Sequence, residues 1–306
     1  MRKYIQRLLL IFSLYSAIIF PFTVKAEMSS TNYLIQFDSV GVGGTDSSSS
    51  ASYSVRDTLE FIDGVGTSTS YRVDQGYRAG IFDPVVEFSV VAQDTASQVA
   101  ATAIATTSVD VTTTTGYAVG DYIAVIQDEG LSQVTAMGKI TSVAGLTLNV
   151  DYFEYATSLP SIDSSNDYVY ELTDTGIPLS SLTPSTVSTG ILGWDVDADV
   201  PSGYSVYVFE DHDLRVNVTD VINDVSDGSV TASVEEYGGR SSDPTLFGST
   251  FDTVDTAFTT SLQQVGSRNF AVLKSRNFLT LKAAAATTSV DGAYSHTLTV
   301  VFVGDY

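Results

Sequence analysis

The feature of the sequence that most constrains its fold is an alternation of apolar and polar residues with a period of two. Near the C-terminal end, the run "YSHTLTVVFV" places Tyr294, Leu298, Val300 and Phe302 on one face, with serine and threonine on the other. The runs "GYSVYVF" and "ILGWDVDA" alternate in the same way. Successive side chains of a β-strand point to opposite faces, so this period indicates half-buried strands. We therefore expect an all-β chain built of tandem antiparallel β-sandwich and β-barrel domains.

The N-terminal segment has the pattern of an export signal. A basic start, "MRKYIQR", is followed by an apolar stretch and by "VKA", which suits a signal-peptidase site. A retained membrane anchor is the alternative, and Pro21 together with the acceptable cleavage site disfavours it. We expect residues 1–26 to be a signal peptide cleaved between Ala26 and Glu27, which predicts an extracellular or cell-surface protein with no later membrane span.

The charge balance excludes some partners. The chain has 36 acidic and 14 basic residues, a net charge of −22, and loss of residues 1–26 would remove four basic residues and change it to −26. Such a chain repels nucleic acids and anionic membranes. The expected partners are further copies of the chain, other cell-surface proteins or glycans.

Three regions follow the expected signal peptide. The first, residues 27–84, repeats a short pattern as "STNYLI", "SASYSV" and "STSYRV", in which Tyr33, Tyr53 and Tyr71 recur. Spacings of about twenty residues suit a strand, a turn and a returning strand, so each copy is expected to open one hairpin-like unit of a repeat-built β-domain.

The other two regions are expected to be nested. Residues 98–172 contain tight-turn signals between apolar strands and predict a small β-barrel module. Residues 85–97 and 173–306 predict a β-sandwich, with the strand at Val85–Val91 as its first. The barrel is then an insertion in the loop that follows this strand.

The sandwich region resembles a group of secreted proteins. Its runs "LTPSTVSTG", "VDADVPSGYSVYV" and "DGAYSHTLTVVFV" are similar to β-sandwich domains of WxL-type and fimbrial bacterial surface proteins. The Trp-x-Leu signature itself is missing, so the peptidoglycan attachment that the resemblance implies is not expected. The run "GYAVGDYIAV" with "GKITSVAGLTLNV" is similar to small β-modules of phage tail and bacterial surface proteins, and the opening repeats resemble uncharacterised exported bacterial proteins.

The sequence offers little for metal binding. It has no cysteine and two histidines, His212 and His296, and a structural or surface role is expected for His296. Asp220, Asp224 and Asp227 form an acidic loop that is a weak candidate for a metal site and is equally consistent with a hydrated turn. No cofactor is expected.

A second acidic run alternates with apolar residues. It begins like a calcium loop but lacks the glycine and the glutamate that such a loop needs at its sixth and twelfth positions. Period-two spacing instead places its carboxylates on the solvent face, opposite Trp194, Val196 and Ala198. These carboxylates belong to Asp195, Asp197 and Asp199.

Aromatic residues gather at the end of the barrel region and are candidates for stacking on sugar rings. The alternative is that they cover strand faces and barrel rims, as tyrosine often does in β-proteins, and we prefer it. The residues are Tyr152, Phe153, Tyr155, Tyr168 and Tyr170.

The most distinctive local feature is an eight-residue duplication, "SRNFAVLK" followed by "SRNFLTLK". Its basic residues, Arg268, Lys274, Arg276 and Lys282, reverse the sign of charge in an acidic chain. They predict either a patch that docks on an acidic face of another copy or an edge strand protected from uncontrolled pairing. Both interpretations remain open.

No nucleophile elbow, phosphate loop or cofactor fingerprint occurs in the sequence, and no catalytic residue is assigned. We expect a non-catalytic exported surface protein with a structural, assembly or adhesive role. A carbohydrate-binding module is the second hypothesis, and a glycan-active enzyme is the third.

Overall fold

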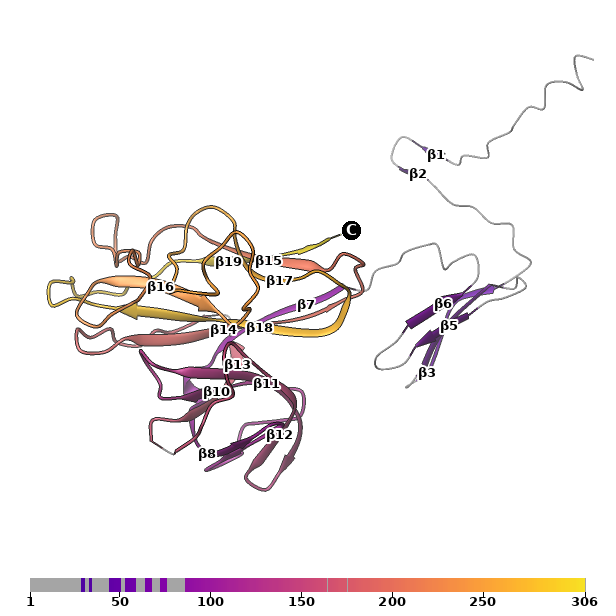
Figure 1. Cartoon of the computed structure of the whole chain (residues 1–306), viewed down its shortest axis with the longest axis horizontal. Coiled ribbons are helices and arrows are strands. Elements are labelled where there is room, and N and C mark those ends of the chain that lie inside the picture. Colours follow the sequence, from indigo (N-terminus) through magenta and orange to yellow (C-terminus); the bar gives the residue numbers. More distant parts are fainter. Residues whose placement is uncertain are drawn as a thin grey trace, which may run out of the picture. The chain divides into compact units, whose positions relative to one another are not determined.

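The computed structural model describes residues 86–163, 165–174 and 176–305, and the backbone of six short strands between residues 29 and 75. The chain divides into two compact units, Met1–Phe82 and Asp83–Tyr306. Figure 1 shows the strands of both units along the chain. The second unit carries every side chain discussed below.

In the first unit the six strands pair as three antiparallel hairpins. Tyr33 pairs with Ser30 and Tyr53 pairs with Ser50, so each of these tyrosines opens the second strand of its hairpin. This differs from the expectation that the repeat opens a hairpin, because Ser30 and Ser50 of the serine-rich lead end the first strand of each hairpin. Tyr71 lies outside the described residues. The strands are β1 (Ser29–Ser30), β2 (Tyr33–Leu34), β3 (Gly44–Ser50), β4 (Tyr53–Thr58), β5 (Gly64–Thr67) and β6 (Arg72–Gln75).

The second unit contains a closed six-stranded antiparallel barrel. Its strands follow the order β10-β11-β12-β9-β8-β13, and a further pairing of β13 with β10 closes the ring. Closure leaves no free edge, and apolar side chains from all around the ring fill the interior, among them Ile123, Ile140 and Val169. The strands are β8 (Val99–Ala105), β9 (Ser108–Val111), β10 (Tyr122–Gln127), β11 (Val134–Ala144), β12 (Thr147–Tyr155) and β13 (Tyr168–Asp174).

The rest of the second unit is a two-layered β-sandwich. One layer continues from the barrel in the order β13-β7-β14-β18-β16, and the other is a three-stranded sheet in the order β17-β15-β19. A short 3₁₀ turn at Thr95–Ser97 connects β7 to the barrel. The strands are β7 (Val86–Gln93), β14 (Ser188–Ala198), β15 (Tyr204–Glu210), β16 (Glu236–Ser241), β17 (Gln263–Arg268), β18 (Val272–Ala284) and β19 (Leu298–Gly304).

Alternation along the strands builds the sandwich core. Trp194, Val196 and Ala198 are fully buried, which confirms the inward face predicted for this strand. They pack with residues of the facing sheet, including Val206. The six-membered ring of Trp194 lies against Gly266, where an added Cβ would come within 2.9 Å of the indole. The absence of a side chain at Gly266 therefore lets the two sheets close around the tryptophan.

The barrel covers the outer face of the sandwich layer that contains β14 and β18 (Figure 1). A second apolar cluster lies between them and joins Ile126, Met137 and Leu172 of the barrel with Ile191 of β14 and Phe278 of β18. The central layer therefore has an apolar face on each side, one toward the facing sheet and one toward the barrel.

The all-β prediction is confirmed. No helix among the described residues is both long and apolar enough to cross a membrane. The predicted C-terminal strand exists but begins at Leu298, four residues later than the alternation suggests, because Ser295 and His296 form contacts outside the ladder. That the barrel is a separate domain inserted in the sandwich domain remains a prediction.

Candidate functional site

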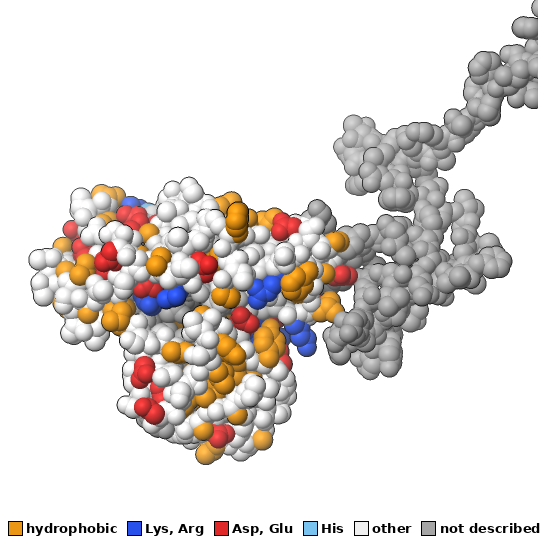
Figure 2. All heavy atoms as spheres, in the orientation of Figure 1, with side chains coloured by type: hydrophobic (Ala, Val, Ile, Leu, Met, Phe, Trp, Pro, Cys, Tyr) orange, Lys and Arg blue, Asp and Glu red, His pale blue; other side chains and the backbone are white. Residues whose placement is uncertain are grey.

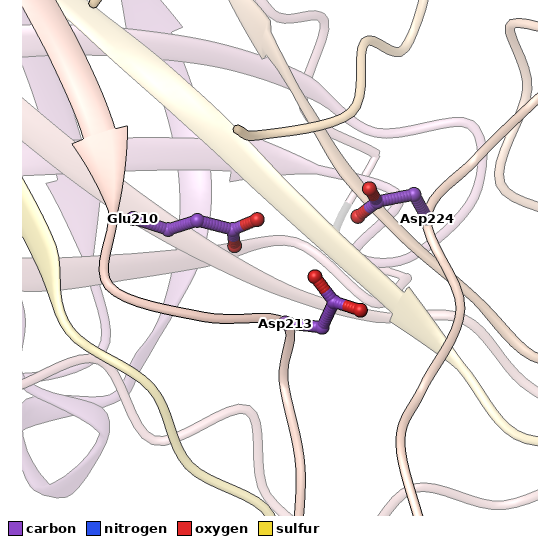
Figure 3. Close-up of side chains that lie close together, drawn as sticks. All are labelled: Glu210, Asp213 and Asp224. Atoms are coloured by element: carbon purple, nitrogen blue, oxygen red, sulfur yellow. The ribbon is translucent and has the colours of Figure 1, made fainter. Parts of the chain in front are cut away.

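Three carboxylates converge where β15 ends. Glu210 is the last residue of this strand, and Asp213 and Asp224 follow in the long loop that leads to β16. Their side chains point toward one another (Figure 3), and one oxygen from each lies within 4.8 Å of the other two. Glu210 is buried, Asp224 is half-buried and Asp213 is exposed, so the group opens toward solvent on one side.

A chain of hydrogen bonds extends from this carboxylate cluster into the sandwich. Nδ1 of His296 lies 3.1 Å from a carboxylate oxygen of Glu210, and Nε2 lies 2.9 Å from the hydroxyl of Tyr237. The imidazole stands edge-on to the Tyr237 ring, with their centroids 4.9 Å apart. Glu210 thus fixes the ring of His296, and His296 in turn fixes the tyrosine hydroxyl.

Burial and like charge change the acidity of this cluster. Burial raises the pKa of Asp224 to about 6, and the negative charges of Glu210 and Asp213 add to the effect. Oδ1 of Asp224 is buried and accepts no hydrogen bond from the described residues. Burial, followed by the charges of Glu210 and Asp224, also raises the pKa of Tyr237 well above its usual value. The tyrosine is therefore a hydrogen-bond donor or acceptor rather than an ionised base.

The chemistry of the cluster suits a proton or a hard cation. Carboxylate oxygens are the ligands that Ca²⁺ prefers, and a positive ion would relieve the mutual repulsion of the three groups. Glu210, Asp213 and Asp224 are the described residues that could hold one. Near pH 6 a proton on Asp224 relieves part of the same repulsion.

A cleft of about 1190 Å³ lies beside the cluster. Residues 176–184 and 285–298 provide most of its lining, and Tyr237 and His296 contribute to its wall. Much of the remaining surface is apolar, with Leu192 and Ile222 reaching it from the sandwich core. The cleft is large enough for a ligand of several rings. Besides Tyr237 and His296, its polar lining includes serine and threonine side chains and Asp291.

Of the three aspartates predicted for a metal site, only one belongs to this cluster. Asp224 joins the cluster, but Asp220 accepts a hydrogen bond from Asn217 and Asp227 accepts one from the backbone of Ser229. Both therefore stabilise local turns, and the expected three-aspartate loop does not converge. Glu210 and Asp213 were missed, because they precede Asp224 by more than ten residues and have no recognisable spacing.

The aromatic residues proposed for sugar stacking do not share one surface. Phe153 lies in the barrel core, while Tyr168 and Tyr170 belong to or pack against the cluster between barrel and sandwich. The ring of Tyr152 stacks on a guanidinium in the same interface, and Tyr155 alone is exposed, at 42%. The interpretation that they cover strand faces fits this placement, because alternation sends neighbours to opposite sides.

The charged centre of the barrel–sandwich interface is Arg276 on β18, which is 1% exposed. Its guanidinium binds Asp151 of the barrel through two nitrogen–oxygen pairs at 3.1 and 3.0 Å and binds Asp195 of β14 at 3.2 Å. The rings of Tyr122 and Tyr152 lie 5.4 and 4.6 Å from its Cζ atom. One side chain therefore joins both parts of the unit through charge, hydrogen bonds and stacking.

Arg276 lowers the pKa of a carboxylate in the interface. Burial would raise the pKa of Asp151, but the hydrogen bonds and charge of Arg276 outweigh it and hold that pKa below its usual value. Tyr122 donates a hydrogen bond to Asp195 at 2.8 Å and accepts one from Lys139 at 3.0 Å. The acidic residue predicted on a solvent face at Asp195 therefore faces the barrel instead.

The predicted assembly patch is corrected by these contacts. Arg276 cannot face another copy, and Lys282 pairs with the buried Asp255 at 2.9 Å. Arg268 is 23% exposed and lies 3.5 Å from Asp243. Lys274 is exposed, so the four basic residues do not form one external patch.

The expected cleavage site, Ala26 and Glu27, lies outside the described residues. Comparison of the chain with family models, curated proteins and solved structures found no match.

Proposed function

We propose that the protein is a non-catalytic exported protein of the cell surface or extracellular space, with a structural, assembly or adhesive role. The observation that carries this proposal is the interface around Arg276. A buried arginine with two carboxylate partners holds the barrel and the sandwich to each other at this interface.

The physical argument concerns rigidity. A buried guanidinium loses its hydration, and its geometry must be satisfied closely for the interaction to be retained. Bidentate pairing with Asp151, contact with Asp195 and stacking between two tyrosines restrict the barrel to one position on the sandwich. A chain that must present surfaces at a fixed spacing benefits from such an interface.

Cell fractionation with mass determination tests the export and the surface role. The proposal predicts that the protein is recovered from the medium or the cell surface, with an intact mass that shows the loss of residues 1–26. Recovery from the cell interior with the N-terminus intact would contradict it.

The cleft favours a second candidate, a carbohydrate-binding role. Tyr294 lines the cleft and donates a hydrogen bond to the carbonyl of Val290 at 2.8 Å, which holds the ring in place. Calorimetric titration with soluble cell-wall oligosaccharides tests this role. Saturable binding that is weakened by Tyr294→Ala but not by Tyr155→Ala, an exposed tyrosine of the barrel, would favour it, and release of new reducing ends would favour a glycan-active enzyme.

A further inference from the structure

Among the strands that the structure describes, β19 has one edge with no partner strand. β19 pairs with β15 along its whole length, from Leu298 opposite Glu210 to Gly304 opposite Tyr204. Within the described residues, no backbone hydrogen bond reaches the opposite edge of β19. The strand therefore presents a row of unpaired N–H and C=O groups.

The inward-facing side chains of β19 hold the strand against the sandwich core. Leu298, Val300 and Phe302 pack against the sandwich core, and the Phe302 ring lies 5.2 Å from that of Phe88 on β7. An edge held in extended conformation loses little further freedom when another strand pairs with it. The β19 edge is thus prepared for pairing.

The other outer edges of the sandwich are covered or charged. At β16, backbone hydrogen bonds from Tyr237 to Asn223 and between Gly239 and Thr256 occupy the outer side. β17 ends in Arg268. By contrast β19 reads "LTVVFVG", with no charged residue and no proline, the usual devices that prevent edge pairing.

The outward side chains of β19 are also uncharged. They are Thr299, Val301 and Val303, and Val303 is 41% exposed. Two copies of a chain with net charge −22 repel each other over most of their surface, and an uncharged strand is a place where they can meet without adding to that repulsion. An antiparallel strand is also self-complementary across a two-fold axis.

We propose that β19 pairs edge to edge with β19 of a second copy, which joins the two three-stranded sheets into one six-stranded antiparallel sheet. This inference rests on the proposed assembly role and names its partner. Maximum overlap of the seven-residue strand places its middle residue, Val301, opposite Val301 of the second copy, and Thr299 opposite Val303 of the second copy.

Val301→Glu tests the proposed pairing. It would place two like charges directly opposite each other in the pair, and we expect the dissociation constant of the dimer to rise by about tenfold or more. Val218→Glu is the matched control, because Val218 is 79% exposed in a loop and gains the same charge. Light scattering over a concentration series should show a dimer for the unchanged protein and the control, and a weaker one for Val301→Glu.

The chain contains no cysteine, which permits a second test independent of that variant. Val301→Cys should form a disulfide-linked dimer under mild oxidation, whereas Val218→Cys should not, because residues opposite each other in a strand pair have Cβ atoms about 5 Å apart. Emission of the single tryptophan, Trp194, checks that each variant is folded.

A purified protein that remains monomeric would overturn the inference, even if a strand of another protein pairs with the β19 edge in the cell. So would a dimer that neither forms the Val301 cross-link nor responds to Val301→Glu. A monomer found at the cell surface would overturn only this inference, whereas an intracellular dimer would overturn the proposed export and leave the pairing intact.

Discussion

The two copies of the eight-residue duplication have nearly the same sequence and different environments. "SRNFAVLK" spans the end of β17, a turn and the start of β18, while "SRNFLTLK" lies within β18. Phe270 is 57% exposed, but its counterpart Phe278 is 2% exposed. The arginines differ in the same direction, with side chains 23% exposed at Arg268 and 1% exposed at Arg276.

The cause of this difference is the barrel. The second copy lies where the barrel covers the central layer, so its outward residues meet Met137, Asp151 and Tyr152 instead of water. The exposed face of a strand is therefore not fixed by its own sequence, because another module can cover it. Figure 2 shows the barrel and sandwich surfaces meeting along this layer. The chain thus supplies matched pairs of variants in which the same substitution is made in two environments.

The phenylalanine pair should show the largest contrast. Phe278→Ala removes a buried ring from the cluster between barrel and sandwich and should lower the free energy of unfolding by about 3–4 kcal/mol. Phe270→Ala should change it by less than about 0.5 kcal/mol, because the ring is mostly in water. Urea unfolding followed by Trp194 emission measures both, and equal effects would mean that the second copy is not covered.

The arginine pair comes next. Arg276→Gln leaves Asp151 and Asp195 without their cation and should cost about 2–3 kcal/mol, less than for a fully buried pair because both carboxylates are 19% exposed. Arg268→Gln should cost about 1 kcal/mol at most, because Asp243 also accepts hydrogen bonds from the backbone of Ser267 and Thr245. If Arg276→Gln leaves the free energy of unfolding unchanged in chemical denaturation, Arg276 does not hold the barrel and the sandwich together.

The lysine pair should differ less. Lys282→Gln leaves the buried carboxylate of Asp255 with the backbone N–H of Val230 as its remaining described donor, and should cost about 1–2 kcal/mol. Lys274→Gln should change stability by less than about 0.5 kcal/mol, because Lys274 is exposed. Thermal unfolding of the two variants in parallel measures the two losses of stability. Equal losses would contradict the predicted difference between the two lysines.

The asparagines of the two copies, Asn277 and Asn269, also differ in environment, and the partner of Asn277 makes the stability of the protein depend on pH. Asn277 donates a hydrogen bond to Glu154 of the barrel at 3.2 Å, whereas its counterpart Asn269 is exposed. Burial raises the pKa of Glu154 to about 7, above its ordinary value of 4.5, so the folded state holds a proton that the unfolded state releases. The stability contributed by this proton is present below pH 4.5 and is lost as pH rises through 7.

Glu154→Gln should therefore remove one part of the fall in stability between pH 4.5 and 7. Subtraction of its stability curve from that of the unchanged protein isolates this residue from the other carboxylates. Glu87→Gln, in which an exposed glutamate is changed, is the control. A difference curve that is flat across this range would show that Glu154 is not buried in the interface.

The predictable part of this structure follows from alternation. The period of two correctly placed Trp194 in the sandwich core and Asp195 on the opposite face of the strand, because strand geometry fixes the face of each residue, but the prediction that this opposite face meets solvent was wrong at Asp195. Alternation could not show that the barrel covers Asp195 and Arg276, since the contacts with Tyr122 and Asp151 join residues 73 and 125 positions apart. The same limit applies to the carboxylate cluster, where Glu210 and Asp224 meet through a loop with no periodic pattern.

The central claim is that barrel and sandwich unfold as one body held at Arg276. Hydrogen–deuterium pulse labelling through a urea titration, read by mass spectrometry, reports barrel peptides from β10–β12 and sandwich peptides from β14 and β15 in the same sample. The account predicts that both sets lose protection at the same urea concentration. Loss of protection in the barrel while β14 and β15 remain protected would contradict it.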